Sequence, residues 1–303
     1  MTLIKKIIAA VDFSDHGEIV LRRAVALTQS SQAELHVLHV LPDLPYEGAT
    51  QSDEIVTWMN QWEEEATEKL NQKILEVVNN QVEVNSEVRV GVPFRETLHY
   101  ANQIDADLIL IGSEGKSGIS SLLLGKTAES VARNFWRPVW IERVEGPSSI
   151  QEILVPVDLS QLAHETVEEA IQWAKFFKFK LHLLHVMQMP YLPSYSLVSA
   201  ERFDKSLRNI GKEHFQNFIE KLNLDGVDYE IHFREGDPVS EVMRFINEKK
   251  ISLMALGSRG QTDLSPKLLG SVALDLLRHA PASILLLRPK SLDLSWLRES
   301  FNS

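Results

Sequence analysis

The stretch Ile251-Ser252-Leu253-Met254-Ala255-Leu256-Gly257-Ser258-Arg259-Gly260 is followed by nine residues and then by Gly270-Ser271. A related stretch lies 145 positions earlier: Asp107 to Ile111, then Gly112-Ser113-Glu114-Gly115, nine residues and Gly125-Lys126. In each copy an apolar run typical of a buried strand leads into a glycine loop. Such a loop, leaving a strand and entering a helix, exposes backbone N–H groups that can hold phosphate. The chain is therefore predicted to contain two copies of one unit, each with a candidate nucleotide site.

Other landmarks repeat at a nearly constant offset, which is the signature of an internal duplication. Val11-Asp12-Phe13-Ser14 matches Val157-Asp158-Leu159-Ser160 at an offset of 146. The run from Leu35 to Val40 matches the run from Leu181 to Val186 at the same offset. Because the landmarks keep one order and spacing, the two halves are expected to share one fold.

The duplication predicts one domain over residues 1–146 and a second over 147–290, with a C-terminal tail over 291–303. The seam falls at Gly146-Pro147-Ser148-Ser149, whose residue types favour turns. The tail has three open interpretations: it docks on the body of the protein, it docks on a partner, or it is a frayed helix.

Strand-like and helix-like patterns alternate within each copy. Ile7 to Val11 is a short apolar run that suits a strand covered on both faces, and Ser14 or Asp15 can cap the helix that follows. A surface helix is predicted over residues 58–78. Its expected apolar stripe consists of Trp62, Ala66, Leu70 and Ile74.

Two prolines mark the start of later helices. Pro93 and Pro238 suit the first helical position, where a missing N–H does no harm, and Asp237 is a good cap for the second of these helices. The complete order is βαβαβαβαβ, twice. This alternation predicts an α/β protein of two doubly wound, five-stranded parallel sheets, with ligands beyond the carboxyl ends of the strands.

Composition excludes several classes of function. The net charge is −11 and no basic run is present, so binding to nucleic acid through phosphate neutralisation is not expected. The chain has no cysteine, which excludes a disulfide framework, a thiol nucleophile and cysteine-ligated metals. Neither a signal peptide nor an apolar stretch of membrane-spanning length is recognised. A cytoplasmic protein without membrane contact is the expectation.

The two aspartates that end the first strand of each copy, Asp12 and Asp158, have two interpretations. Each lies where a ligand site is predicted, so its carboxylate can accept a hydrogen bond from a ribose or a base. Each can equally cap the helix that follows. Both interpretations remain open, since a duplicated cap would recur as a duplicated site does.

The glycine loops are the strongest functional signal. Gly112 and Gly257 are expected to permit a sharp exit from the strand, since glycine tolerates positive φ. Gly115 and Gly260 would allow the backbone close to a phosphate. The pairs Gly125-Lys126 and Gly270-Ser271 would begin the next helix, whose dipole favours an anion. Arg259 adds a charge that can reach a phosphate tail. The alternative is a tight strand–helix turn with no ligand.

Other motifs do not qualify. The P-loop fails because Ser120 stands where its first glycine is required, and no Gly-x-Gly-x-x-Gly follows a first strand, which argues against a nicotinamide cofactor. The pairs His36/His39 and His182/His185 have i and i+3 spacing, which places the members on opposite faces of a strand. No metal site and no catalytic set are therefore predicted, which favours a binding protein over an enzyme.

The chain resembles a tandem universal stress protein over nearly all of its length. The resemblance rests on Val11 to Ser14, on Val155 to Ser160, on both Leu-His-Val strand ends and on both glycine loops. It implies an adenine nucleotide alpha hydrolase-like fold that binds ATP with Mg²⁺ as companion ion. The implied site residues are Asp12, Val40, Gly112, Gly115 and Gly125 in the first copy. Those implied in the second are Asp158, Val186, Gly257, Gly260, Gly270 and Ser271. Lys126 and Arg259 are added as candidates because their own charges can meet a phosphate.

The chain departs from the family pattern at several positions. Lys126 replaces the usual Ser or Thr and Glu114 adds a carboxylate to the first loop, while Asp263 and Pro266 alter the second. The second copy is the better nucleotide site, because Gly270-Ser271 and Arg259 are intact there.

The resemblance also implies that family domains pair through their last strands. A tandem chain can form such a pair within itself, as an intramolecular pseudo-dimer, and two chains can form a homodimer. The sequence names no protein partner. The implied function is an ATP-binding stress-response regulator that is non-catalytic or weakly hydrolysing. One alternative is an interaction scaffold in which one or both nucleotide pockets are inactive or hold another ligand. The other alternative is a nucleotide-dependent enzyme such as an ATPase.

Overall fold

The computed structural model describes residues 4–43, 53–113, 124–143, 149–189, 200–258 and 269–301. The chain forms two compact units. Unit 1 comprises Met1–Val144 together with Asp293–Ser303, and unit 2 comprises Glu145–Leu292.

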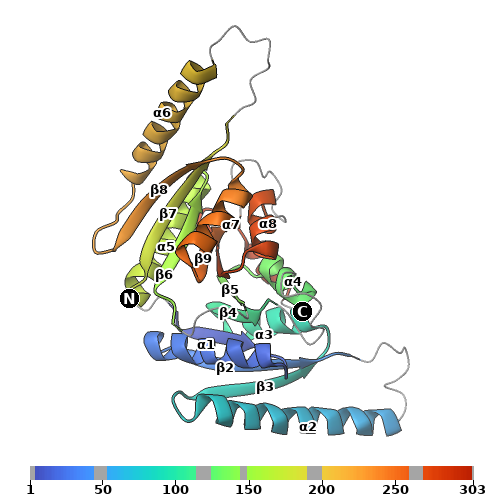
Figure 1. Ribbon diagram of the computed structural model, residues 1–303. Coiled ribbons are helices and arrows are strands. Elements are labelled where there is room, and N and C mark those ends of the chain that lie inside the picture. Colours follow the sequence, from blue (N-terminus) through green and yellow to red (C-terminus); the bar gives the residue numbers. More distant parts are fainter. Residues whose placement is uncertain are drawn as a thin grey trace. The chain divides into compact units, whose positions relative to one another are not determined.

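Unit 1 contains a parallel sheet of order β3-β2-β1-β4-β5. Figure 1 labels its strands β2, β3, β4 and β5. Helices α1 and α2 pack together beside the sheet, as do α3 and α4. Its elements are β1 (Lys6–Ala10), α1 (Asp15–Ser31), β2 (Glu34–Leu41), α2 (Asp53–Val78), β3 (Val84–Val90), α3 (Pro93–Ile104), β4 (Leu108–Gly112), α4 (Lys126–Asn134), β5 (Val139–Glu142) and α9 (Ser295–Glu299).

Unit 2 repeats this plan with a parallel sheet of order β8-β7-β6-β9-β10. Its elements are β6 (Glu152–Val157), α5 (Gln161–Phe177), β7 (Lys180–Met187), α6 (Ala200–Ile219), β8 (Tyr229–Glu235), α7 (Pro238–Lys249), β9 (Leu253–Gly257), α8 (Ser271–His279) and β10 (Ser283–Leu287). Both five-stranded parallel sheets confirm the predicted fold class.

The inner strands form the core of each unit. Ile7 and Ile8 of β1, and Leu154 of β6, have no exposed surface. Such continuous apolar runs are expected where helices cover both faces of a parallel sheet. Since β1 lies between β2 and β4, and β6 between β7 and β9, strand order reverses beside these strands. That reversal places a crevice at their carboxyl ends.

Helix starts follow the predicted signals. The Ser14 side chain caps α1 by accepting a hydrogen bond from the N–H of Gly17, and Ser160 caps α5 by accepting from Ala163. Asp237 caps α7 through the N–H of Ser240, and Pro93 and Pro238 lie in the first turns of α3 and α7. These predicted helix starts are confirmed.

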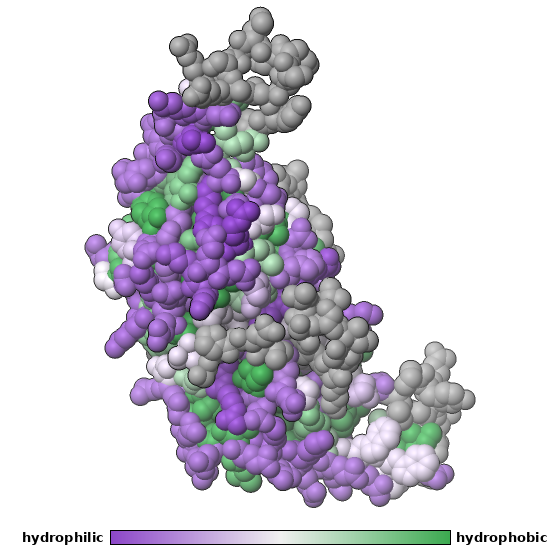
Figure 2. Space-filling model, viewed as in Figure 1, coloured by the Kyte–Doolittle hydropathy of each residue, from purple (hydrophilic) through white to green (hydrophobic). Residues whose placement is uncertain are grey.

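Helix α2 departs from the prediction at its N-terminal half. It begins at Asp53, before the predicted start. Ala66 and Leu70 of the predicted stripe are buried, but the Trp62 side chain is 51% exposed. The expectation that Trp62 faces the core is therefore wrong. Figure 2 shows pale and apolar atoms at the lower right, where Val56, Trp58 and Trp62 are exposed at this end of the helix.

The C-terminal segment packs on unit 1. The Arg298 guanidinium pairs with the Asp105 carboxylate at 2.9 Å and donates to Oδ1 of Asn102 at 3.0 Å. The Asn102 amide in turn donates to the carbonyl oxygen of Phe301 at 3.1 Å, and Leu297 is buried. Of the open interpretations of the tail, the described residues show docking on the body.

A buried ion pair distinguishes the two units. In unit 1 the Arg23 guanidinium on α1 bonds the Glu142 carboxylate at the end of β5 at 3.1 Å, and the Trp140 indole donates to the other carboxylate oxygen at 2.6 Å. Both charged side chains are less than a tenth exposed. In unit 2 the matching positions are Glu169 and Leu287, so the pair has no counterpart there.

Replacing Arg23 by Met is expected to destabilise unit 1. The change leaves the Glu142 carboxylate buried without its cation, which typically costs about 3–5 kcal/mol. Arg22→Met is the matched control, since Arg22 pairs with Glu18 at the surface with 60% of its side chain exposed; its loss should stay within about 1 kcal/mol. Urea unfolding measures both. Equal effects of the two substitutions would contradict the assigned role of the pair.

The Glu169 carboxyl is expected to make unit 2 less stable as pH rises. Burial raises its pKa from 4.5 to about 7, although the positive charges of Lys290 and Arg288 act in the opposite direction. The folded state therefore binds more protons than the unfolded state between these values, so the free energy of unfolding falls as pH rises from about 4.5 to 7. Glu169→Gln should be more stable than the native protein at pH 8 by roughly 1–3 kcal/mol, and equal to it near pH 4.5.

Urea titrations at several pH values measure this difference. Glu168→Gln, on the exposed side of the same helix, is the control and should show no pH-dependent gain. A gain of the same size at every pH would mean that the substitution acts through packing instead of proton binding.

Candidate functional site

A proline in the central strand of unit 2 shortens the hydrogen-bonded pairing of that strand with β9. In unit 1 the N–H of Val11 bonds to Leu38 on β2, so the N–H of the preceding Ala10 points to the other neighbour, β4. The position that matches Ala10 in unit 2 is Pro156, which has no N–H to donate to β9. Accordingly β1 and β4 pair over four residues, whereas β6 and β9 pair only at Ile153 and Leu154.

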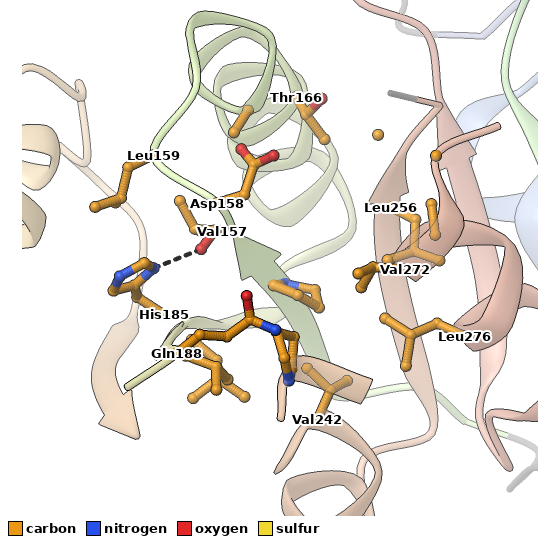
Figure 3. A pocket seen from close by; sticks show the side chains of 18 of the residues that line it. Val157, Asp158, Leu159, Thr166, His185, Gln188, Val242, Leu256, Val272 and Leu276 are labelled. Atoms are coloured by element: carbon orange, nitrogen blue, oxygen red, sulfur yellow. Dashed lines mark hydrogen bonds between the residues drawn. The ribbon is translucent and has the colours of Figure 1, made fainter. Parts of the chain in front are cut away.

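A cavity of about 590 Å³ lies at the carboxyl ends of these strands. Its walls come from β6, β7 and β9 and from the helices α5, α7 and α8, and Figure 3 shows their side chains around one space. The apolar part of the wall includes Val157, Leu159, Val186, Val242, Leu256 and Leu276.

Polar side chains occupy the α5 side of the cavity (Figure 3). Oδ1 of Asp158 accepts a hydrogen bond from the N–H of Ser160 at 3.0 Å, while Thr166 faces the same space from α5. Nδ1 of His185 lies 2.7 Å from the carbonyl oxygen of Val157. Burial lowers the pKa of His185, although the bond to Val157 opposes this, so the ring is neutral at pH 7 with its proton on Nδ1.

The N-terminus of α8 forms the opposite side. Gly270 precedes it with no side-chain cap, whereas Ser160 and Asp237 cap α5 and α7. The N–H of Leu274 bonds to the Gly270 carbonyl, but those of the first turn before it have no partner within the helix. Gly270, Ser271, Val272 and Ala273 all line the cavity. Because α8 has no acidic residue in its first turn, no carboxylate of that turn repels an anion bound there.

The loop from β9 to α8 is closed by main-chain bonds at its described ends. The N–H of Gly270 bonds to the carbonyl of Ser258 at 3.4 Å, and the N–H of Ser258 bonds to Leu287 at 3.3 Å. Unit 1 repeats both bonds, from Gly125 to Ser113 and from Ser113 to Glu142. Each unit therefore holds the start of its helix beside the end of its strand.

The corresponding region of unit 1 is built differently. The Phe13 ring lies 4.1 Å from the His39 ring, and the Lys69 ammonium lies 4.6 Å from the Phe13 centroid. A Cβ added at Gly17 would lie only 2.1 Å from the carbonyl oxygen of Asp12, whereas unit 2 has Ala163 at this position. The turn after β1 is thus pressed against α1 in unit 1, and the first turn of α4 carries an acid, Glu129.

The predicted site residues of unit 2 come together where they are described. Asp158, Val186, Gly257, Gly270 and Ser271 all line the cavity at the carboxyl ends of β6, β7 and β9. In unit 1, Asp12 follows β1, Val40 lies near the end of β2, Gly112 ends β4, and Gly125 and Lys126 begin α4. Three predicted residues, Gly115, Arg259 and Gly260, lie outside the described residues.

Two details of the prediction change. Gly112 and Gly257 are the last residues of β4 and β9, and neither has positive φ, so the expected reason for glycine at these positions is wrong. Both aspartates also serve the chain itself, since Oδ1 of Asp12 and of Asp158 accepts from the N–H of the capping serine two residues later. The cap itself is the serine.

Sequence reasoning missed several cavity residues. Thr166 and Gln188 carry no motif that would mark them. His185 lies in the second Leu-His-Val strand end, but that motif predicts a site role only for Val186. Pro156 carried a usable signal. A proline inside an apolar run that reads as a central strand indicates interrupted pairing.

Comparison with known proteins assigns the chain to a family. The universal stress protein family model matches residues 3–143 and again residues 149–288. Because these matches span most of the chain, it belongs to the universal stress protein family and carries two tandem copies of the domain. Universal stress protein MJ0531 of Methanocaldococcus jannaschii is 31% identical over 144 residues, which cover 47% of this chain and 85% of that protein.

Solved structures show the same fold. A universal stress protein of Archaeoglobus fulgidus superposes with a TM-score of 0.63 at 19% identity, covering 94% of this chain and 98% of that chain. Another universal stress protein, solved in complex with cAMP, is 22% identical, covers 47% of this chain and 99% of that chain, and has a TM-score of 0.34. Among the helices of the described ranges, none has the length and apolar character needed to cross a membrane.

The Leu159 backbone at the cavity is strained. Its φ is +62°, a left-handed conformation that costs a branched side chain about 1–2 kcal/mol. Asparagine tolerates this conformation better, so Leu159→Asn should leave stability unchanged or raise it by up to about 1 kcal/mol. The matched Phe13→Asn removes the ring contact with His39 and should lower stability by about 1–3 kcal/mol. Urea unfolding compares them, and equal losses would contradict strain at Leu159.

Proposed function

We propose that unit 2 binds an adenine nucleotide, ATP with Mg²⁺ as its companion ion, and that the protein is a non-catalytic or weakly hydrolysing stress-response regulator. The observation that carries this proposal is the cavity of about 590 Å³ with an uncapped helix N-terminus on one side and Asp158 on the other. Cavities of small-molecule sites fall between about 300 and 1,000 Å³.

The lining of the cavity fits the parts of a nucleotide. Apolar side chains from β6, β7 and β9 offer a surface for a purine ring. The Asp158 carboxylate can accept a bond from a ribose hydroxyl. The N–H groups at the start of α8 and the Ser271 hydroxyl can donate to phosphate oxygens. Donors at one end and an acceptor at the other give the ligand one orientation.

Regulation is favoured over turnover by the polar side chains that line the cavity. Among the described residues that line the cavity none is a lysine or an arginine, the side chains that stabilise charge developing on a transferred phosphoryl group. Occupancy would instead change the conformation or assembly that a partner reads. A cytoplasmic location, pairing of the two domains within the chain and homodimer formation belong to the same proposal.

A second candidate function is an interaction scaffold. It is favoured by the exposed apolar side chains of α2, where Trp58 and Trp62 are each 51% exposed. Gly257→Ala combined with Gly270→Ala tests this alternative in cells. If the phenotype of a deletion is rescued by this variant as well as by the native protein, the scaffold is supported over nucleotide sensing. The matched pair Gly112→Ala and Gly125→Ala serves as control.

Calorimetric titration with Mg-ATP tests the main proposal. Asp158→Asn keeps the oxygen that accepts from Ser160 but loses the charge, so ATP affinity should fall at least about tenfold. Asp12→Asn makes the same change in unit 1 and should alter affinity less than about twofold. ADP, AMP and cAMP titrations define which phosphates the site needs.

Bound ligand is identified independently by denaturing freshly purified protein and chromatographing the released small molecules. Native protein that releases no nucleotide, and that also shows no heat on titration with Mg-ATP, would overturn nucleotide binding. Equal losses in Asp158→Asn and Asp12→Asn would instead overturn the assignment of the site to unit 2.

A further inference from the structure

A second polar cluster lies in unit 2 at the outer strands of the sheet, toward their amino-terminal ends. It consists of His182 on β7 and of Glu230 and His232 on β8. His182 is the direct neighbour of Glu230 in the parallel register, and His232 follows Glu230 by two residues. Side chains with this spacing share one face of the sheet, which here is the face covered by α7, because both rings contact Phe245.

The three side chains converge on one point. Nδ1 of His182 lies 3.1 Å from Nε2 of His232. Oε2 of Glu230 lies 3.7 Å from the first nitrogen and 3.4 Å from the second. In a tetrahedral site with metal–ligand bonds of about 2.0–2.1 Å, neighbouring ligand atoms are about 3.4 Å apart. The three observed distances scatter around this value.

The surroundings hold the ligand atoms in place. Lys180 donates to Oε1 of Glu230 at 2.6 Å, which leaves Oε2 turned toward the two rings. The far nitrogen of His182, Nε2, is buried without a hydrogen bond, and its nearest anion is Oε2 of Glu152 at 3.5 Å. A carboxylate behind a histidine is the usual support of a metal-bound imidazole.

The charged groups around the cluster are mixed in sign. The Glu230 carboxylate bonds Lys180 through Oε1 and turns Oε2 toward the two rings, while the Glu152 carboxylate lies 3.5 Å from His182. Positive charges also lie nearby, since Lys180 bonds the Glu230 carboxylate and Arg234 acts on His232. The Lys249 ammonium lies 3.7 Å from Oε2, on a flexible side chain that is about half exposed and can move away.

Unit 1 provides an internal comparison. His36 matches His182, but the positions of Glu230 and His232 hold Asn85 and Glu87. Nδ1 of His36 lies 2.9 Å from the hydroxyl of Tyr100, the residue that matches Phe245. That hydroxyl satisfies the ring nitrogen in unit 1, whereas in unit 2 an apolar phenylalanine stands beside two imidazoles and a carboxylate.

We propose that His182, Glu230 and His232 bind a divalent transition-metal ion, zinc in particular, on the face of the unit 2 sheet beneath α7. Two imidazole nitrogens and one carboxylate oxygen match zinc and not the oxygen-only sets of Mg²⁺ and Ca²⁺. Three protein ligands leave a fourth position for water. The site is separate from the nucleotide cavity, none of whose lining residues is a ligand.

The spacing of histidines within single strands predicts no metal site, since ligands on a neighbouring strand leave no trace in that spacing. His182 and His185 do face opposite sides, as expected: the first contacts Phe245 on α7 and the second contacts Phe215 on α6. The remaining ligands come from the neighbouring strand, whose register the sequence does not show.

Zinc binding to the full chain tests the proposal. The protein is treated with EDTA, freed of chelator and titrated with zinc sulfate against a chromophoric competitor. One ion per chain is expected, and His232→Asn and Glu230→Gln should each weaken binding at least about tenfold. His36→Asn, the matched change in unit 1, should bind as the native protein does. Cobalt substitution should give the intense visible bands of a tetrahedral site.

Circular dichroism of the zinc-free variants checks that they fold. If a ligand variant does not fold, Glu152→Gln removes only the carboxylate behind His182 and should weaken binding about 10–100-fold. Native protein that binds less than one equivalent of zinc at micromolar concentration would overturn the proposal. So would ligand variants that fold and bind zinc as tightly as the native chain.

Discussion

A buried parallel sheet is stable only when its backbone N–H and C=O groups are paired, and the central strand of unit 2 contains a residue without an N–H. Pro156 of β6 stands where Ala10 of β1 still pairs with β4 in unit 1. Pairing between β6 and β9 ends two residues earlier, at Leu154. The cavity lies beyond the carboxyl ends of these strands, where Asp158, Gly257 and the start of α8 line it.

The duplication let two copies of one scaffold diverge at three places that bear on function. Unit 1 has an ion pair between Arg23 and Glu142 at the end of its last strand, whereas unit 2 has Leu287 and a Glu169 whose pKa burial raises to about 7. At the first strand, Phe13 covers His39 in unit 1, while Leu159 takes a strained backbone and lines a cavity in unit 2. At the outer strands, a tyrosine hydroxyl gives way to a cluster of two histidines and a glutamate.

The sequence predicted what local patterns decide. The doubly wound fold follows from local patterns: the apolar strand runs, the serine and aspartate caps, the prolines that begin helices and the constant repeat offset. The glycine loops predict the end of the sheet at which a ligand would bind. Prediction from the sequence failed where strand register or helix packing decides. Trp62 has the spacing of a core residue, but it lies in the N-terminal half of α2, where most side chains are exposed, whereas Ala66 and Leu70 further along are buried. Glu230 meets His182 only through the register of β7 and β8.

Helix α9 belongs to unit 1 although it follows the whole of unit 2 in the chain. The ribosome therefore makes the first body of unit 1, then all of unit 2, and only afterwards the segment whose Arg298 and Phe301 contact Asn102. Until that segment has been synthesised, the surface of unit 1 around Asn102 is exposed to solvent. The contacts of α9 with unit 1 therefore form after unit 2 has been synthesised. The position of α9 at the C-terminal end of the chain thus makes its docking the last folding step of unit 1.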